Sequence, residues 1–210
     1  ALHAFAAGQA FDAGTLTERF DGVFSAETDF MDKVADMDAV FDDEPSLEPL
    51  REVFFDLLMV NFFSADVIRL EEDYLDSPEW TAIEEKTLDR GTELLNLLLY
   101  LTECIDEDID PELDDYLKEF LLVDDDEFQD EYLIYEPVIE NQILMDSPVS
   151  EIARTAAALP GNAELKALFY AMMCFFQHPG TSEQFKDEVK KNAPDAPFDM
   201  AVYEILPNFK

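Results

Sequence analysis

The stretch LREVFFDLLMVNFFSADVIRL, from Leu50 to Leu70, is the part of this chain that decides its fold. Its large apolar residues fall on nearly all sides of a helix, and they are Val53, Phe54, Phe55, Leu57, Leu58, Met59, Phe62 and Phe63. A helix that is apolar all round must be surrounded by other elements. We therefore expect 50–70 to form a central helix that the rest of the chain covers.

Helical spacing of apolar residues continues on both sides of this stretch. The expected helices cover about residues 15–24, 30–41, 78–104, 112–121, 124–143 with a kink or restart at Pro137, 148–159, 162–177 and 181 onward. Gly91 falls inside the helix expected over 78–104, which suggests that another backbone approaches closely there. The last stretch, with its three prolines, is expected to be a loosely helical tail.

Capping signals mark several of the helix starts. Thr15 and Thr181 are each followed three residues later by Glu or Gln, which is the spacing of a capping box. Ser77-Pro78-Glu79 combines a capping hydroxyl, a proline at the first helical position and an early carboxylate. Asp124-Asp125-Asp126 is expected to cap another helix.

Alternating strand patterns joined by hairpin turns do not accompany these helices. The predicted fold is all-α, a single compact bundle of about eight to ten helices. We expect residues 1–160 to form a helical core and residues 161–210 a C-terminal helical extension packed on that core.

The most unusual property of the composition is its charge. Fifty acidic residues stand against thirteen basic ones, which gives a formal net charge of −37. A charge of this size repels nucleic acids and anionic membranes and attracts cationic segments of other proteins. We expect a partner with a basic segment, no nucleic acid and no membrane insertion, and a chain that is a monomer or weak dimer.

The chain is expected to be cytoplasmic. Cys104 and Cys174 each have apolar neighbours in the sequence, as buried reduced thiols do. A run of about eighteen apolar residues, which a membrane-spanning helix requires, does not occur. Residues 1–11 are better interpreted as an amphipathic helix than as a secretory signal.

Acidic residues crowd the segment from Asp106 to Asp115, where a calcium loop could be sought. A loop starting at Asp108 would need glycine at its sixth place, which is Leu113 here. His3 and His178 are the only histidines, so zinc sites, dimetal sites and nucleophile triads lack ligands or bases. We expect no metal, no cofactor and no enzymatic activity.

Trp80, Tyr74 and Tyr116 could line a groove, but each lies on an apolar stripe, which favours a core position. Met172 and Met173 could form an adaptable peptide-binding surface, and here too the core position is favoured.

The segment from Leu88 to Glu127 reads LDRGTELLNLLLYLTECIDEDIDPELDDYLKEFLLVDDDE. Asp89-Arg90-Gly91 and a leucine-rich stretch are followed by three short matches, Glu112-Leu113, Asp115-Tyr116-Leu117 and Glu119-Phe120-Leu121. This order resembles a block of the TorD/DmsD/NarJ-type redox-enzyme maturation chaperones, which proofread twin-arginine signals. Asp114 stands where proline is usual in that block, and Tyr116 where histidine is frequent.

The resemblance implies an all-helical chaperone without a metal. It would bind the N-terminal or signal segment of a molybdenum-containing oxidoreductase subunit during maturation. A twin-arginine signal is a cationic stretch followed by an apolar one, which suits an acidic surface beside a groove. We expect that groove near the loop that precedes Glu112, with these candidate peptide-binding residues: Asp89, Arg90, Glu112, Asp115, Tyr116 and Glu119.

Two alternatives stay open. Asp115 and Glu119 could be the solvated side of one helix, and Arg90 could simply pair with a neighbouring acid. The function could also be that of an acidic antagonist, a nucleic-acid mimic or immunity protein that binds a basic protein partner, since the carboxylates spread along the whole chain.

Overall fold

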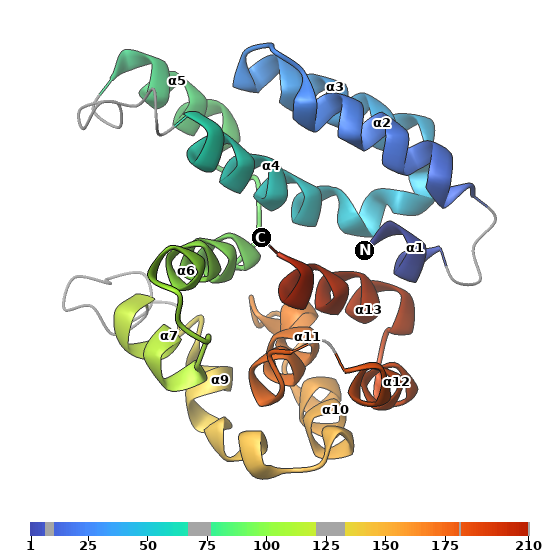
Figure 1. The fold of residues 1–210 in the computed structure, drawn as a ribbon, viewed down its shortest axis with the longest axis vertical. Coiled ribbons are helices and arrows are strands. Elements are labelled where there is room, and N and C mark those ends of the chain that lie inside the picture. Colours follow the sequence, from blue (N-terminus) through green and yellow to red (C-terminus); the bar gives the residue numbers. More distant parts are fainter. Residues whose placement is uncertain (7–10, 67–76, 121–132, 181, 210) are drawn as a thin grey trace. The chain divides into compact units, whose positions relative to one another are not determined.

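The computed structural model describes residues 1–6, 11–66, 77–120, 133–180 and 182–209. In these ranges every regular element is a helix, with twelve α-helices, three 3-10 helices and no strand. The all-α prediction is confirmed (Figure 1). The α-helices are more numerous than predicted, because the stretch expected over 78–104 and the stretch from 181 onward each contain two α-helices.

Contacts within the chain define two compact units. One contains residues 12–95 and the other contains residues 1–11 and 96–210; we call them the 12–95 unit and the 96–210 unit. These units divide the chain between residues 95 and 96 and not at residue 160, where a boundary was predicted. Residues 161–210 belong to the same unit as residues 96–160.

The 12–95 unit is built on α2 (Ala13–Ser25), α3 (Phe30–Asp43), the 3-10 helix η1 (Pro45–Leu50), α4 (Arg51–Asp66) and α5 (Pro78–Thr87). Helices α2 and α3 lie side by side, and α3 packs on α4 (Figure 1). Phenylalanine rings fill this core: the ring centroid of Phe20 lies 4.3 Å from that of Phe54 and 5.2 Å from that of Phe41. Most of the apolar stretch that decided the fold is buried here, as predicted, whereas Phe62 and Phe63 are half-buried.

Two of the helix starts in this unit test the capping predictions. Ser77 Oγ accepts a hydrogen bond from Trp80 N at 3.1 Å, so the cap of α5 is confirmed. The capping box at Thr15 was wrong. Asp12 is the N-cap of α2 instead, accepting from Gly14 N at 3.0 Å and from the Thr15 hydroxyl at 2.7 Å. The acceptor at this helix start is the carboxylate of Asp12 and not the hydroxyl of Thr15, and residue spacing alone does not reveal which side chain accepts.

The helix expected over 78–104 is interrupted by a short link. Helix α5 ends at Thr87, α6 runs from Leu94 to Glu107, and residues 88–93 form what we call the 88–93 link. Gly91 has a φ of +88°, in the left-handed region that favours glycine. A Cβ at this position would come within 2.7 Å of Asp56 Oδ1. The expected close approach at Gly91 is therefore present, but to side chains of α4 rather than to a backbone.

In the 96–210 unit, α6 is followed by α7 (Leu113–Phe120), α9 (Glu136–Glu140) and the 3-10 helix η3 (Gln142–Asp146). Four longer helices come next, α10 (Val149–Ala158), α11 (Lys166–Gln177), α12 (Glu183–Asn192) and α13 (Ala196–Ile205). The short α1 (Leu2–Phe5) and the 3-10 helix η4 (Leu206–Asn208) pack against α13. Pro137 lies in the first turn of α9, where it starts that helix.

Helix α11 is the centre of this unit. All nine residues from Leu168 to Phe176 are buried, and α10, α13 and η3 pack around the helix (Figure 1). Met172 and Met173 are core residues, as predicted. The expectation of a loose C-terminal tail was wrong, because the residues Met200 to Tyr203 of α13 are buried against α11 and α1. Pro197 and Pro207 lie at helix starts, where a missing N–H costs nothing.

The predictions for the two cysteines, the remaining helix caps and Tyr74 can also be compared with the structure. Cys104 and Cys174 are both buried thiols, as predicted. Ser182 caps α12, while Thr181, the predicted cap, lies outside the described residues. The same is true of the cap predicted at 124–126 and of Tyr74. Among the described residues, the helices are all too short or too polar to cross a membrane.

Candidate peptide-binding pockets

Arg90 in the 88–93 link is held by carboxylates from two helices. Its Nε donates to both carboxylate oxygens of Glu52 on α4 at 3.0 Å, and its Nη atoms donate to Asp38 on α3 at 3.1 and 3.2 Å. The guanidinium lies 4.8 Å from the ring centroid of Phe55. The alternative that Arg90 pairs with neighbouring acids is confirmed, and this pairing fixes the link against α3 and α4.

Asp56 anchors the same link one helical turn after Glu52. Its side chain is fully buried and accepts from Thr92 N at 2.9 Å and from Thr92 Oγ1 at 2.5 Å. The Thr92 hydroxyl accepts in turn from Leu94 N at 3.1 Å, so it caps the first turn of α6. Burial raises the pKa of Asp56 to about 7, against an opposing effect of the Thr92 hydrogen bonds.

A pocket of about 470 Å³, which we call the aromatic pocket, opens beside the link in the 12–95 unit. Its apolar lining consists of Phe55, Met59, Phe63, Trp80, Leu88 and Leu95. Trp80, the only tryptophan, is half-buried, with its ring centroid 5.4 Å from that of Phe63. Glu84 and Glu85 are exposed at the edge of the pocket, and Leu88 is 83% exposed. The arrangement suits a ligand with an apolar body and a positive charge.

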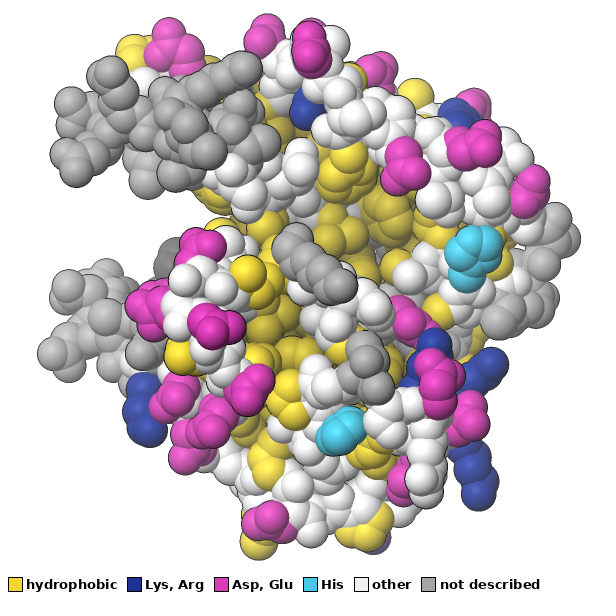
Figure 2. Space-filling view, in the orientation of Figure 1, with side chains coloured by type: hydrophobic (Ala, Val, Ile, Leu, Met, Phe, Trp, Pro, Cys, Tyr) yellow, Lys and Arg dark blue, Asp and Glu magenta, His cyan; other side chains and the backbone are white. Residues whose placement is uncertain are grey.

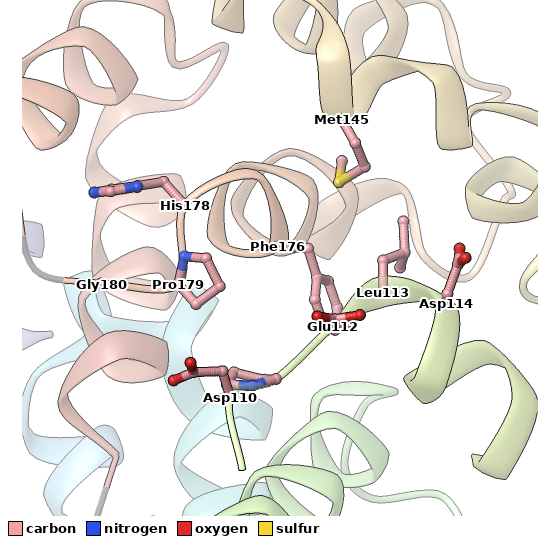
Figure 3. Close-up of a pocket in the computed structure, with 10 residues that line it drawn as sticks. Asp110, Glu112, Leu113, Asp114, Met145, Phe176, His178, Pro179 and Gly180 are labelled. Atoms are coloured by element: carbon pink, nitrogen blue, oxygen red, sulfur yellow. The ribbon is translucent and has the colours of Figure 1, made fainter.

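The 96–210 unit has a second pocket, of about 540 Å³, where α7 begins; we call it the α7 pocket (Figure 3). Leu113, Met145 and Phe176 bring apolar surface to it from α7, η3 and α11. Its remaining lining is formed by the carboxylate residues Asp110, Glu112 and Asp114, the histidine His178, and Pro111, Pro179 and Gly180.

Hydrogen bonds to backbone groups hold both sides of the α7 pocket in place. The buried Tyr100 hydroxyl accepts from Glu112 N at 3.0 Å and donates to Glu112 O at 3.1 Å, which fixes the backbone before α7. On the opposite side, Gln177 Nε2 donates to Leu144 O at 3.1 Å and to Met145 O at 3.2 Å, which ties η3 to the end of α11. Asp110 and Glu112 are thus carried by a fixed loop, and Asp114 by the first turn of α7.

The sequence-predicted site residues divide between the two units. In the 12–95 unit, Arg90 lines the aromatic pocket with its charge already paired, and Asp89 is exposed outside that lining. In the 96–210 unit, Glu112 lines the α7 pocket, beside the loop where a groove was expected. Asp115 is half-buried and lies 3.5 Å from Lys118 Nζ.

Tyr116 and Glu119 complete the predicted set. The side chain of Tyr116 is fully buried, with its ring centroid 5.3 Å from that of Tyr100 and 5.5 Å from that of Phe176. Its interpretation as a core residue is confirmed. Its side chain lies on the buried side of α7 and is not accessible to a client segment. The side chain of Glu119 lies outside the described residues.

Sequence reasoning missed several pocket residues. Asp110 and Asp114 were considered only as part of the acidic segment from Asp106 to Asp115, and Met145 and Phe176 are separated from them by more than thirty positions. The one local signal was Trp80 followed four residues later by Glu84, which places an aromatic ring and a carboxylate on one face of a helix.

Acidic side chains are not confined to the pockets. Figure 2 shows Asp and Glu widely distributed over the described residues on the visible face, with few Lys and Arg among them. The described residues include no group of three or more His, Cys, Asp or Glu side chains placed to hold a metal ion.

Comparisons with known proteins add no family to this description. The chain matches no protein-family model, no curated protein and no solved structure.

Proposed function

We propose that this protein is a chaperone that binds a cationic, partly apolar segment of a client protein in the α7 pocket. The observation that carries the proposal is the combination, in one pocket, of three carboxylate residues with the apolar surface of Leu113, Met145 and Phe176. Carboxylates accept charge-assisted hydrogen bonds from guanidinium groups, and an apolar groove holds the neighbouring side chains of the same segment.

The client that fits best is the N-terminal or signal segment of a molybdenum-containing oxidoreductase subunit, bound in the cytoplasm. Two observations support this choice. The block from Asp89 to Leu121 resembles that of the TorD/DmsD/NarJ-type chaperones. The net charge of −37 independently favours a basic client, because it raises the rate of encounter with cationic segments.

The test is a binding titration with a fluorescent peptide that carries two adjacent arginines followed by an apolar stretch. Replacing Asp110, Glu112 and Asp114 by Asn, Gln and Asn should weaken binding by about 10- to 150-fold, at roughly 0.5–1 kcal/mol for each of three exposed pairs lost. The peptide should also lose affinity when its apolar residues are replaced by serine, because binding then buries less apolar surface against the lining of the pocket.

The matched control replaces Asp106, Glu107 and Asp108 by Asn, Gln and Asn. These exposed residues directly precede the pocket residues in the sequence, and replacing them removes the same number of charges. Asparagine tolerates the left-handed backbone of Asp108 (φ +56°). If both triple variants weaken binding equally, the attraction is general rather than located in the pocket, and the proposal fails.

The wide spread of acidic side chains in Figure 2 favours a second candidate, an acidic antagonist that covers a basic protein. Such a protein would bind a nucleic-acid-binding partner in competition with nucleic acid and with a steep salt dependence. It would not require the apolar half of the peptide, so the serine-substituted peptide distinguishes the two functions.

A further inference from the structure

The 88–93 link is attached to α4 through two carboxylates that are one helical turn apart. Glu52 accepts from Gly91 N at 2.7 Å and Asp56 accepts from Thr92 N at 2.9 Å, so two consecutive backbone N–H groups of the link end on side chains of α4. The carboxyl of Asp56 is fully buried, whereas that of Glu52 reaches the surface, with its side chain 36% exposed.

The charged groups around Asp56 do not stabilise a negative charge on it. Glu52 on α4 and Glu93 in the link are both acids whose charges disfavour a second anion nearby. The guanidinium of Arg90, in the same link, is bonded to Glu52 and to Asp38 on α3. Among the described residues, Asp56 has hydrogen bonds from Thr92 and no ion pair with a lysine or arginine.

Both protonation states of Asp56 can keep the bonds to Thr92. The ionised carboxylate accepts from Thr92 N and Oγ1, and the neutral acid can instead donate from Oδ2 to the Thr92 hydroxyl, which has two lone pairs. The Thr92 hydrogen bonds favour the ionised carboxylate, but the cost of burying its charge is larger and favours the neutral acid while the link is closed. Losing the proton should favour opening of the link to water.

We propose that Asp56 is a proton-controlled latch that keeps the 88–93 link on α4 and so sets the shape of the aromatic pocket. The protonated latch is closed, and ionisation loosens it. Phe55, next to the latch, and Leu88, Arg90 and Leu95, in or beside the link, all line this pocket, so movement of the link changes its wall. The latch is independent of the client proposed above, because the α7 pocket belongs to the other unit.

Trp80 reports on the test, because it is the only tryptophan and lines the same pocket. Acrylamide quenching of its fluorescence is measured between about pH 5.5 and pH 8.5. The wild-type quenching constant should rise by about twofold or more as the link opens, with a midpoint near pH 7. Asp56→Asn, a neutral isostere, should keep the low-pH value throughout. Asp199→Asn is the control and should keep the wild-type transition. Asp199 is a buried carboxyl of the 96–210 unit, and burial raises its pKa to about 6.

A second variant keeps the test informative if Asp56→Asn does not fold, as judged from its circular dichroism. Thr92→Val removes the hydroxyl that donates to the carboxylate, so the midpoint should move to higher pH. A wild-type profile without a transition, a transition that persists in Asp56→Asn, or a midpoint that Thr92→Val leaves in place would each overturn the latch.

Discussion

Replacing Gly91 by alanine should destabilise the 12–95 unit strongly. Two features of the structure act against the new methyl group. The φ of +88° is a backbone conformation that costs an L-residue roughly 1–2 kcal/mol. The Cβ would also stand 2.7 Å from Asp56 Oδ1 and 3.4 Å from Phe55 Cδ1.

The second cost arises because Asp56 is not free to move. Displacing its carboxylate lengthens the hydrogen bonds that Thr92 donates, and such overpacking costs about 1–3 kcal/mol. Together the two effects lower the free energy of unfolding by about 2–5 kcal/mol. Gly22→Ala is the matched control: Gly22 lies inside α2, nothing would meet its Cβ within 4 Å, and alanine should stabilise that helix by about 0.5–1 kcal/mol.

The assay is urea unfolding followed by the fluorescence of Trp80, which reports on the unit that contains both glycines. At an m-value of about 1–2 kcal/mol/M, the midpoint of Gly91→Ala should fall by about 1–5 M, and that of Gly22→Ala should rise slightly. Equal midpoints for wild type and Gly91→Ala would refute the argument that the link is tightly seated on α4.

Three further changes test other parts of the structure. Arg90→Lys loses the guanidinium that bonds two carboxylates, and it should lower the free energy of unfolding, measured in urea, by about 1–2 kcal/mol. Arg154→Lys, in an exposed pair, should change that free energy by less than about 0.5 kcal/mol, and equal effects of the two variants would contradict the anchoring role of Arg90. Tyr170→Phe removes the donor to Val189 O (2.6 Å, buried) and should reduce thermal stability by about 1–2 kcal/mol, while an unchanged melting temperature would show that this carbonyl finds another donor. Burial raises the pKa of the Cys174 thiol to about 12, so a thiol reagent at about pH 8 should modify this thiol only after unfolding. Rapid modification of Cys174 in the native protein would disprove its burial.

Part of the candidate site could be found from the sequence. Glu112 was predicted beside a groove, and the α7 pocket includes it. Arg90 was correctly expected to be able to pair with an acid, but its partners Glu52 and Asp38 lie 38 and 52 positions earlier in the chain. The pattern of one segment carries no information about which distant carboxylate reaches it. For the same reason the apolar half of the α7 pocket, Met145 and Phe176, was not predicted.

Periodicity and capping residues by themselves determined that the chain is all-α and where most of its helices begin, because these are local properties that repeat every few residues. The charge of −37 likewise follows from counting. Only the tertiary structure decided that the helix through Gly91 breaks and that Asp56 is buried beneath the break. It also made α13 a core helix rather than a tail. These outcomes depend on which surfaces meet, and contact between distant segments overrides local preference when it buries apolar area or satisfies a backbone N–H.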